Sequence, residues 1–218
     1  MRRIADGRVR VDGRVVRNPS FRVELGRARL ELDGEPVRER RTSLVIALHK
    51  PAGHVTTRVD PGGRPTVYDL IPELDRFVFP VGRLDRDTRG LLILTDDHRL
   101  GQRLTDPLHH VAKTYHAHGA GVPAEDALEV LRRGITLPDD GTPTRPARVR
   151  SLGVAKDGGA WLEIVLTEGR NRQVRRMCAA IGHDVRDLVR VAIGALELGD
   201  LPAGEWRRLA PEEVARLA

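Results

Sequence analysis

The chain has 218 residues, 40% of them hydrophobic, which suffices for one full domain plus a small second module and excludes a short disordered tail. Its 37 basic and 31 acidic residues give a formal net charge of +6, which points toward a polyanionic partner. The single cysteine, Cys178, excludes an internal disulfide framework and a cysteine-rich zinc site, and no apolar run approaches the roughly 18 residues of a membrane span, so we expect a cytoplasmic protein.

The basic residues concentrate near the N-terminus. Residues 1–41 hold twelve Arg against seven acidic residues and carry +5, whereas the other 177 residues carry +1. Short β-strand patterns fill residues 7–32, and Asp12-Gly13 is a tight hairpin signal between two of them. The polar stretch 35–43 is the best linker candidate. We therefore predict a small β-module at residues 1–40 and a second domain at residues 41–218.

The second region alternates strands with helices. Strands are predicted at 44–48, 91–95, 113–118, 147–154, 160–166 and 188–198, and helices at about 97–105, 124–133 and 171–181 and from Glu212 onward. The helix at 124–133 is expected to bury Ala127, Leu128, Val130 and Leu131 and to end at Gly134. The many hairpins favour a mixed α+β fold, a mostly antiparallel sheet with flanking helices, over a parallel doubly wound sheet.

The segment VGRLDRDTRGLLILTDD, residues 81–97, holds the first candidate for chemistry. Asp85 lies between Gly82 and the loop that leads into a buried strand, a suitable position for a carboxylate that contacts a ligand. A solvated turn with alternating charges is the alternative interpretation. The acids after LLILT are typical of a magnesium-binding strand of a nucleotide hydrolase, but the sequence has no G-x-x-x-x-G-K-[ST] loop, so that hypothesis fails.

The predicted helix at 171–181 sorts its arginines by geometry. At about 100° per residue, Arg172 and Arg176 lie far from the apolar stripe, whereas Arg175 lies at its border. Arg175 is therefore placed to reach a half-buried carboxylate, and the outward arginines suit phosphates. The alternative is a solvated basic face. Cys178 belongs to the apolar stripe and is interpreted as a core residue rather than a nucleophile.

Residues 109–118 offer further candidates. Tyr115 follows Lys113 by two residues, so both side chains share one face of a strand, where the tyrosine either stacks on a base or is an ordinary core residue. Histidines at 109, 110, 116 and 118 invite a metal hypothesis. Because no spacing such as H-E-x-x-H supports it, we expect no metal site.

Six strings occur in a specific order along the chain: LHKPAGHVTT, FPVGRLDRDTRGLLILTDD, KTYHAHGAG, EGRNRQVRRMCAAIGHDV, LVRVAIGAL and GEWRRL. Each is weak alone, but together, over residues 44–209, they resemble the RsuA-like branch of the pseudouridine synthases, which act on ribosomal RNA. The resemblance implies a mixed α+β catalytic domain that isomerises uridine in RNA without a metal or an organic cofactor.

The resemblance also implies roles for single residues. Asp85 is the implied catalytic aspartate, Arg175 its ion-pair partner, and Tyr115 the residue that packs on the target base and takes part in proton removal. Leu188 is implied to line the pocket, while Thr88 and Gly90 shape the aspartate loop. Further substrate-binding side chains are expected at Arg83, Lys113, Arg172, Arg176 and Lys50.

Relatives in this family begin with an S-four-like RNA-binding module whose first helices are missing here, so residues 1–40 are expected to be a truncated form of it. The expected partner is ribosomal RNA or a partly assembled ribosomal subunit, bound by a monomer. Two alternatives stay open. One is a non-catalytic RNA-binding or ribosome-assembly protein that relies on the basic N-terminus, and the other is a carboxylate-dependent nucleic-acid hydrolase with Asp87 as its second acid.

Overall fold

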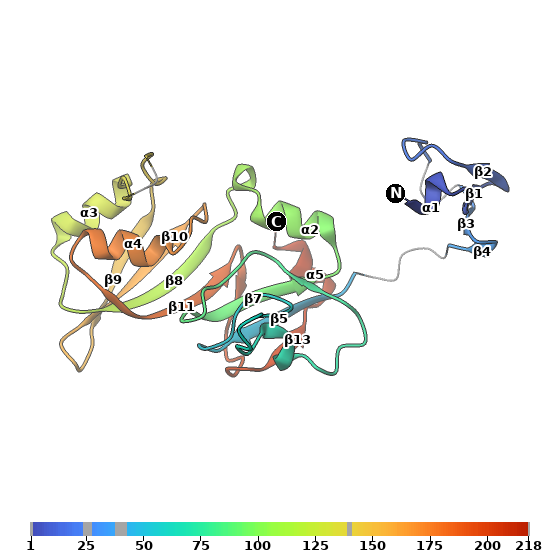
Figure 1. Cartoon of the computed structure of the whole chain (residues 1–218). Coiled ribbons are helices and arrows are strands. Elements are labelled where there is room, and N and C mark those ends of the chain that lie inside the picture. Colours follow the sequence, from blue (N-terminus) through green and yellow to red (C-terminus); the bar gives the residue numbers. More distant parts are fainter. Residues whose placement is uncertain (1, 24–27, 38–42, 139–140, 218) are drawn as a thin grey trace. The chain divides into compact units, whose positions relative to one another are not determined.

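The computed structural model describes residues 2–23, 28–37, 43–138 and 141–217. The chain divides into two compact units, Met1–Ser43 and Leu44–Ala218 (Figure 1). No helix within the described residues is long and apolar enough to cross a membrane.

The first unit contains a small antiparallel sheet with the strand order β2-β1-β3-β4. Its elements are α1 (Arg2–Ala5), β1 (Val9–Val11), β2 (Arg14–Val16), β3 (Leu30–Leu32) and β4 (Glu35–Pro36). Asp12 and Gly13 both have positive φ, 49° and 80°, as a type I′ turn requires, so the predicted hairpin is confirmed. The first two residues of the linker candidate form β4, and residues 38–42 lie outside the described residues.

The second unit is built on a nine-stranded sheet in which seven strands follow the order β13-β5-β7-β11-β8-β10-β9, with β6 beside β7 and β12 beside β11. The strands are β5 (Val45–Lys50), β6 (Phe79–Pro80), β7 (Arg89–Thr95), β8 (Lys113–Gly119), β9 (Arg148–Val154), β10 (Ala160–Leu166), β11 (Val185–Ile193), β12 (Leu196–Glu197) and β13 (Trp206–Arg208). The helices are η1 (Val67–Leu70), α2 (His98–Thr105), η2 (Pro107–His109), α3 (Glu125–Arg133), α4 (Gln173–Ala180) and α5 (Pro211–Ala215). The mostly antiparallel α+β fold is therefore confirmed.

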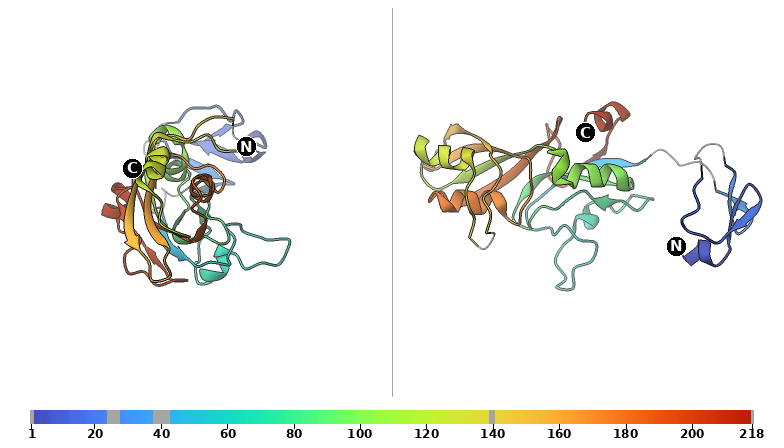
Figure 2. Two further views of the ribbon diagram at one scale, coloured as in Figure 1. Left: turned by 90° about the vertical axis from the view of Figure 1, so that its left-hand side faces the viewer. Right: turned by 90° about the horizontal axis from the view of Figure 1, so that it is seen from above.

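Apolar clusters hold the helices of the second unit to its sheet. Helices α3 and α4 lie together on one face of the β8–β11 half, where Leu131 and Met177 pack against Leu162 (Figures 1 and 2). In the other half, β5 and β7 have apolar clusters on both faces, which explains why their segments read as unbroken apolar runs. Val130 on α3 is 45% exposed, so its expected burial is wrong.

Strands β7 and β11 are parallel neighbours at the centre of the sheet, with Gly90 opposite Arg190. The φ of Gly90 is +113°, and a Cβ there would lie 2.3 Å from the carbonyl oxygen of Arg190. Only glycine permits this approach, because any side chain would push the strands apart. The approach brings the loop that precedes β7, which carries Asp85, close to β11.

Candidate active site

A cleft of about 440 Å³ lies beside the junction of β7 and β11. Its walls come from the loop before β7, the end of α2, the start of β8, the loop before α4, and β11. Six of the nine residues that the sequence assigned to catalysis or substrate binding line it: Arg83, Asp85, Lys113, Tyr115, Arg172 and Leu188. Segments that are more than 100 residues apart in the chain therefore meet around one carboxylate.

Asp85 lies in a loop that neighbouring backbone holds in place. Its side chain is 31% exposed, and it also lines a second hollow of about 430 Å³ together with Thr56 and Arg86. The Thr56 hydroxyl donates to the Leu84 carbonyl at 2.8 Å, and the Gly53 amide donates to the Arg86 carbonyl at 2.8 Å. The carboxylate is thus accessible to a ligand although its backbone is fixed.

Lys50 lies beneath this loop and is fully buried. Its ammonium donates to the carbonyl oxygens of Thr88 at 2.7 Å, Pro51 at 3.1 Å and Arg86 at 3.3 Å. Burial lowers the pKa of Lys50 to about 8, although the nearby carboxylates of Asp87 and Asp85 oppose that shift. The expectation that Lys50 binds substrate is wrong, because the side chain is used inside the protein to hold the loop.

Arg172, before α4, and Arg175, within it, both contact Asp87. Arg172 donates to both carboxylate oxygens of Asp87, at 3.0 and 3.1 Å, and its Nη1 lies 3.8 Å from Oδ2 of Asp85. Arg175 donates to the carbonyl oxygens of Val185 at 2.9 Å and of Asp87 at 3.1 Å. The hydrogen bond from Arg172 lowers the pKa of Asp87.

The expected ion pair between Asp85 and Arg175 does not occur among the described residues; Arg172 is the cation within 4 Å of Asp85. The reason is local. The helix begins at Gln173, two residues later than predicted, and Arg172 precedes it with a left-handed φ of 47°. That conformation directs Arg172 toward the 85–87 loop. If residue 172 were helical, its side chain would instead face outward.

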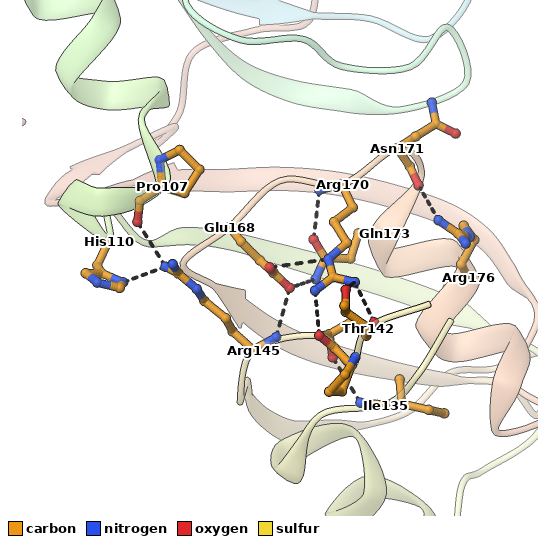
Figure 3. A network of polar contacts seen from close by, with 12 residues as sticks. Pro107, His110, Ile135, Thr142, Arg145, Glu168, Arg170, Asn171, Gln173 and Arg176 are labelled. Atoms are coloured by element: carbon orange, nitrogen blue, oxygen red, sulfur yellow. Dashed lines mark hydrogen bonds and ion pairs between the residues drawn. The ribbon is translucent and has the colours of Figure 1, made fainter. Parts of the chain in front are cut away.

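Arg176 does not line the cleft, contrary to expectation. Its guanidinium donates to the carbonyl oxygens of Pro138 and Asn171. Figure 3 shows Arg176 reaching Asn171. Because these contacts are to the backbone of its own domain, Arg176 is not among the candidates for contact with RNA in the cleft.

A network around Glu168 positions the loop that carries Arg172 (Figure 3). Glu168 Oε1 accepts hydrogen bonds from the side chain of Gln173 at 2.6 Å and from the backbone amide of Arg145 at 3.0 Å. Arg145 in turn donates to the Pro107 carbonyl at 2.9 Å and approaches Nδ1 of His110 at 2.8 Å. Sequence reasoning missed this network, although Glu168 and Gln173 stand in one of the quoted strings.

Arg190 is a second residue of the cleft that the sequence did not indicate. It is 4% exposed, and its Nε donates to the carbonyl oxygen of Leu91 at 2.8 Å. Burial, and after it the charge of Arg190, lowers the pKa of Lys113. The sequence feature that could have indicated Arg190 is its position two residues after Leu188, because this spacing puts both side chains on one face of a regular strand.

The remaining candidates have ordinary structural roles. Cys178 is buried in the core under α4, as predicted, and burial raises the pKa of its thiol to about 12. No cluster of His, Cys, Asp or Glu that could hold a metal occurs within the part of the chain that the structure describes. His116 and His118 instead approach Glu163 at 3.5 Å and Asp157 at 3.2 Å.

Comparison with known proteins identifies the catalytic unit. The RNA pseudouridylate synthase family matches residues 44–180, more than half of the chain. The chain belongs to this family. The S4 domain matches residues 2–27, within the N-terminal unit. The resemblance to the RsuA-like pseudouridine synthases is thereby confirmed.

Relatives cover three quarters or more of this pseudouridine synthase. The ribosomal large subunit pseudouridine synthase B of Bacillus subtilis (strain 168) is 39% identical over 214 residues, which are 98% of this chain and 86% of the relative. The ribosomal large subunit pseudouridine synthase E of Xanthomonas campestris pv. campestris is 42% identical over 182 residues, 75% of this chain and 94% of the relative. A crystal structure of a pseudouridylate synthase is 31% identical, with a TM-score of 0.74 over 100% of this chain and 91% of that one.

Family membership settles the class of reaction. The chain is an enzyme that isomerises uridine in RNA, which excludes the purely RNA-binding and the hydrolytic alternatives.

Proposed function

We propose that this pseudouridine synthase modifies a specific uridine of ribosomal RNA and that Asp85 acts directly on the target nucleotide. The ribosomal substrate is supported by the relatives, whose names specify the large ribosomal subunit. The observation that carries the role of Asp85 is its place in the cleft: it is a ligand-accessible carboxylate beside Tyr115, Leu188 and Arg172.

The chemistry requires such a group. The N1–C1′ glycosidic bond must break, the uracil must turn while it stays bound, and a new bond must join C1′ to C5. A carboxylate assists either by attacking C1′ or by removing a sugar proton, and a closed pocket prevents escape of the free uracil. Arg172 Nη1 lies 3.8 Å from Oδ2 of Asp85, so a cation stands beside the carboxylate that performs either role.

Tyr115 and Leu188 serve the base in this proposal. The target nucleotide has to leave its stack, and an aromatic ring with an apolar neighbour replaces the stacking that it loses. Tyr115 lies on β8 and Leu188 on the adjacent β11, and both line the cleft with Asp85. Arg83, exposed at the cleft entrance, supplies a contact for an RNA phosphate.

The test is the isosteric substitution Asp85→Asn. We expect it to abolish pseudouridine formation while leaving RNA affinity and thermal stability close to those of the wild type, because the amide keeps the shape and loses the charge. Tritium release from ribosomal RNA labelled at C5 of uridine measures the reaction. Asp126→Asn, at the exposed start of α3, is the matched control. Substantial tritium release by Asp85→Asn would reject the role of this aspartate.

A further inference from the structure

Two polar atoms that border the cleft are buried and have no hydrogen-bond partner among the described residues: Nη2 of Arg190 and Oγ1 of Thr88. The Nε of Arg190 donates a hydrogen bond to the carbonyl oxygen of Leu91. A guanidinium is always charged and is seldom buried unless its donors are paired, because leaving them unpaired costs free energy. An unpaired donor in a ligand cleft is therefore a donor that is available to the ligand.

Lys113 adds a second cation to the same wall. It is half-buried, and within the described part of the chain its ammonium makes no hydrogen bond or ion pair. The other charges nearby are compensated: Asp87 pairs with Arg172, and Glu168 pairs with Arg170 at 3.4 Å. Arg190 and Lys113 thus form a positively charged wall that no carboxylate of the described ranges pairs with.

The sheet brings these three groups together from adjacent strands. Thr88 directly precedes β7, Arg190 lies on β11, and Lys113 begins β8; the sheet order is β7-β11-β8. In the register, Arg190 is opposite Gly90 on one side and Tyr115 on the other. The wall therefore adjoins Tyr115, the residue proposed to contact the base.

We propose that Arg190, Lys113 and Thr88 form an anion site that stabilises the negative charge of the detached uracil. This inference rests on the proposed function. When the N1–C1′ bond breaks, its electron pair stays on the uracil, and the charge spreads over N1 and the carbonyl oxygens. Asp85 either bonds to C1′ or takes a proton from C2′. The uracil then uses its ring electrons to form the C5–C1′ bond, while Asp85 leaves C1′ in the first case or its proton returns to C2′ in the second. Finally C5 loses a proton and N1 gains one.

A site that stabilises the charge developing on the uracil raises the rate constant of the reaction more than it raises the affinity for RNA. Donors fixed in a dry pocket and aimed at such charge contribute about 100- to 1000-fold in rate, because they need no reorganisation during the reaction. A backbone phosphate of the RNA is another source of anionic oxygen. If the site bound such a phosphate instead, removing one of its cations would weaken RNA binding and would reduce the salt dependence of binding by about one phosphate contact.

The experiment compares Lys113→Met and Arg190→Gln with the wild type. We expect the single-turnover rate constant at saturating RNA to fall at least about 100-fold, while the Kd and its salt dependence stay unchanged. Lys156→Met, on an exposed hairpin, is the matched control and should behave as the wild type. A raised Kd with a smaller salt slope and a normal rate would assign the site to phosphate, and unchanged kinetics would reject it.

A second measurement separates charge stabilisation from a structural role. Fluorine at C5 of the target uridine stabilises the uracil anion, so cleavage of the glycosidic bond should depend less on the two cations. We expect the rate deficit of Lys113→Met, measured as loss of the target uridine, to shrink with this RNA. A deficit of equal size on both RNAs would mean that the substitution only loosens the fold. Since Lys113 is half-buried, this test stands even if Arg190→Gln fails to fold.

The outcomes also separate this inference from the proposed function. If Asp85→Asn still releases tritium, the proposed role of Asp85 fails. If Asp85→Asn is inactive and Lys113→Met is as fast as the wild type, the proposed function stands and the anion site fails.

Discussion

At the scale of single residues, the buried ammonium of Lys50 shapes the loop that carries the accessible carboxylate of Asp85. A charged ammonium in the protein interior is unfavourable unless hydrogen bonds satisfy its protons. Lys50 meets that condition with three carbonyl oxygens, two of which belong to Arg86 and Thr88 on either side of Asp87. Its charge also faces the carboxylates of Asp85 and Asp87. We infer that Lys50 fixes the loop in the conformation that presents Asp85 to the cleft.

The lowered pKa of Lys50 predicts a pH-dependent stability. Its pKa is about 8 in the folded protein against 10.5 for the free side chain, so between these values the unfolded chain binds more protons. The stability of the wild type should therefore rise relative to Lys50→Met from pH 8 to pH 10.5, by about 3 kcal/mol at most. Below pH 8 the difference between the two proteins should be constant. Urea unfolding at each pH measures it, and parallel profiles would show that Lys50 does not titrate in this range.

At the scale of elements, the start of α4 decides which arginine meets which acid. The apolar stripe of the helix was predictable from its spacing, and Val174, Met177 and Cys178 are buried as expected. The position of the first helical residue was not, because it depends on contacts outside the helix. Gln173, which opens α4, is bound by Glu168, and its own side chain accepts from the amide of Arg170 at 3.0 Å. These contacts leave Arg172 outside the helix.

The hydrogen bonds of Glu168 should therefore keep the loop before α4, which carries Arg172, in a fixed conformation. In Glu168→Ala, the amide of Arg145 and the side chain of Gln173 lose their acceptor, and we expect a loss of roughly 2 kcal/mol in the free energy of unfolding. The amides of Arg145 and Arg170 should exchange faster with solvent, while those of β10 stay protected. Hydrogen exchange resolved by residue provides the measurement.

Glu125→Ala serves as the control, because it removes an exposed carboxylate that pairs with Arg132 on α3. Such a pair contributes little, so its loss should change stability by less than about 1 kcal/mol and leave the exchange of Arg145 unaltered. Equal effects of the two substitutions would show that Glu168 is only another surface carboxylate.

At the scale of the whole molecule, the sequence predicted the class of fold and six of the residues around the cleft. Those residues were found because strand periodicity, helix periodicity and the family strings can all be recognised from residues that are close together in the sequence. Lys50 and Arg176 were misassigned because a basic residue in a motif does not reveal whether it faces ligand or backbone. Arg190 and the Glu168 network were missed because they arise from strands and loops that are distant in the chain.

The uneven charge predicts a division of labour between the two units. Residues 1–41 carry +5, and residues 2–27 match the S4 domain. The unit Leu44–Ala218 holds every described residue of the cleft and all three apolar clusters. Deleting residues 1–43 should therefore leave a folded enzyme whose single-turnover rate at saturating RNA is within about threefold of the wild type, since no cleft residue is lost. The Kd for ribosomal RNA should rise at least about tenfold, and binding should depend less on salt because fewer phosphates are neutralised. Titrations at several salt concentrations measure both effects, and a slower rate at unchanged Kd would instead mean that the S4 module acts on the reaction itself.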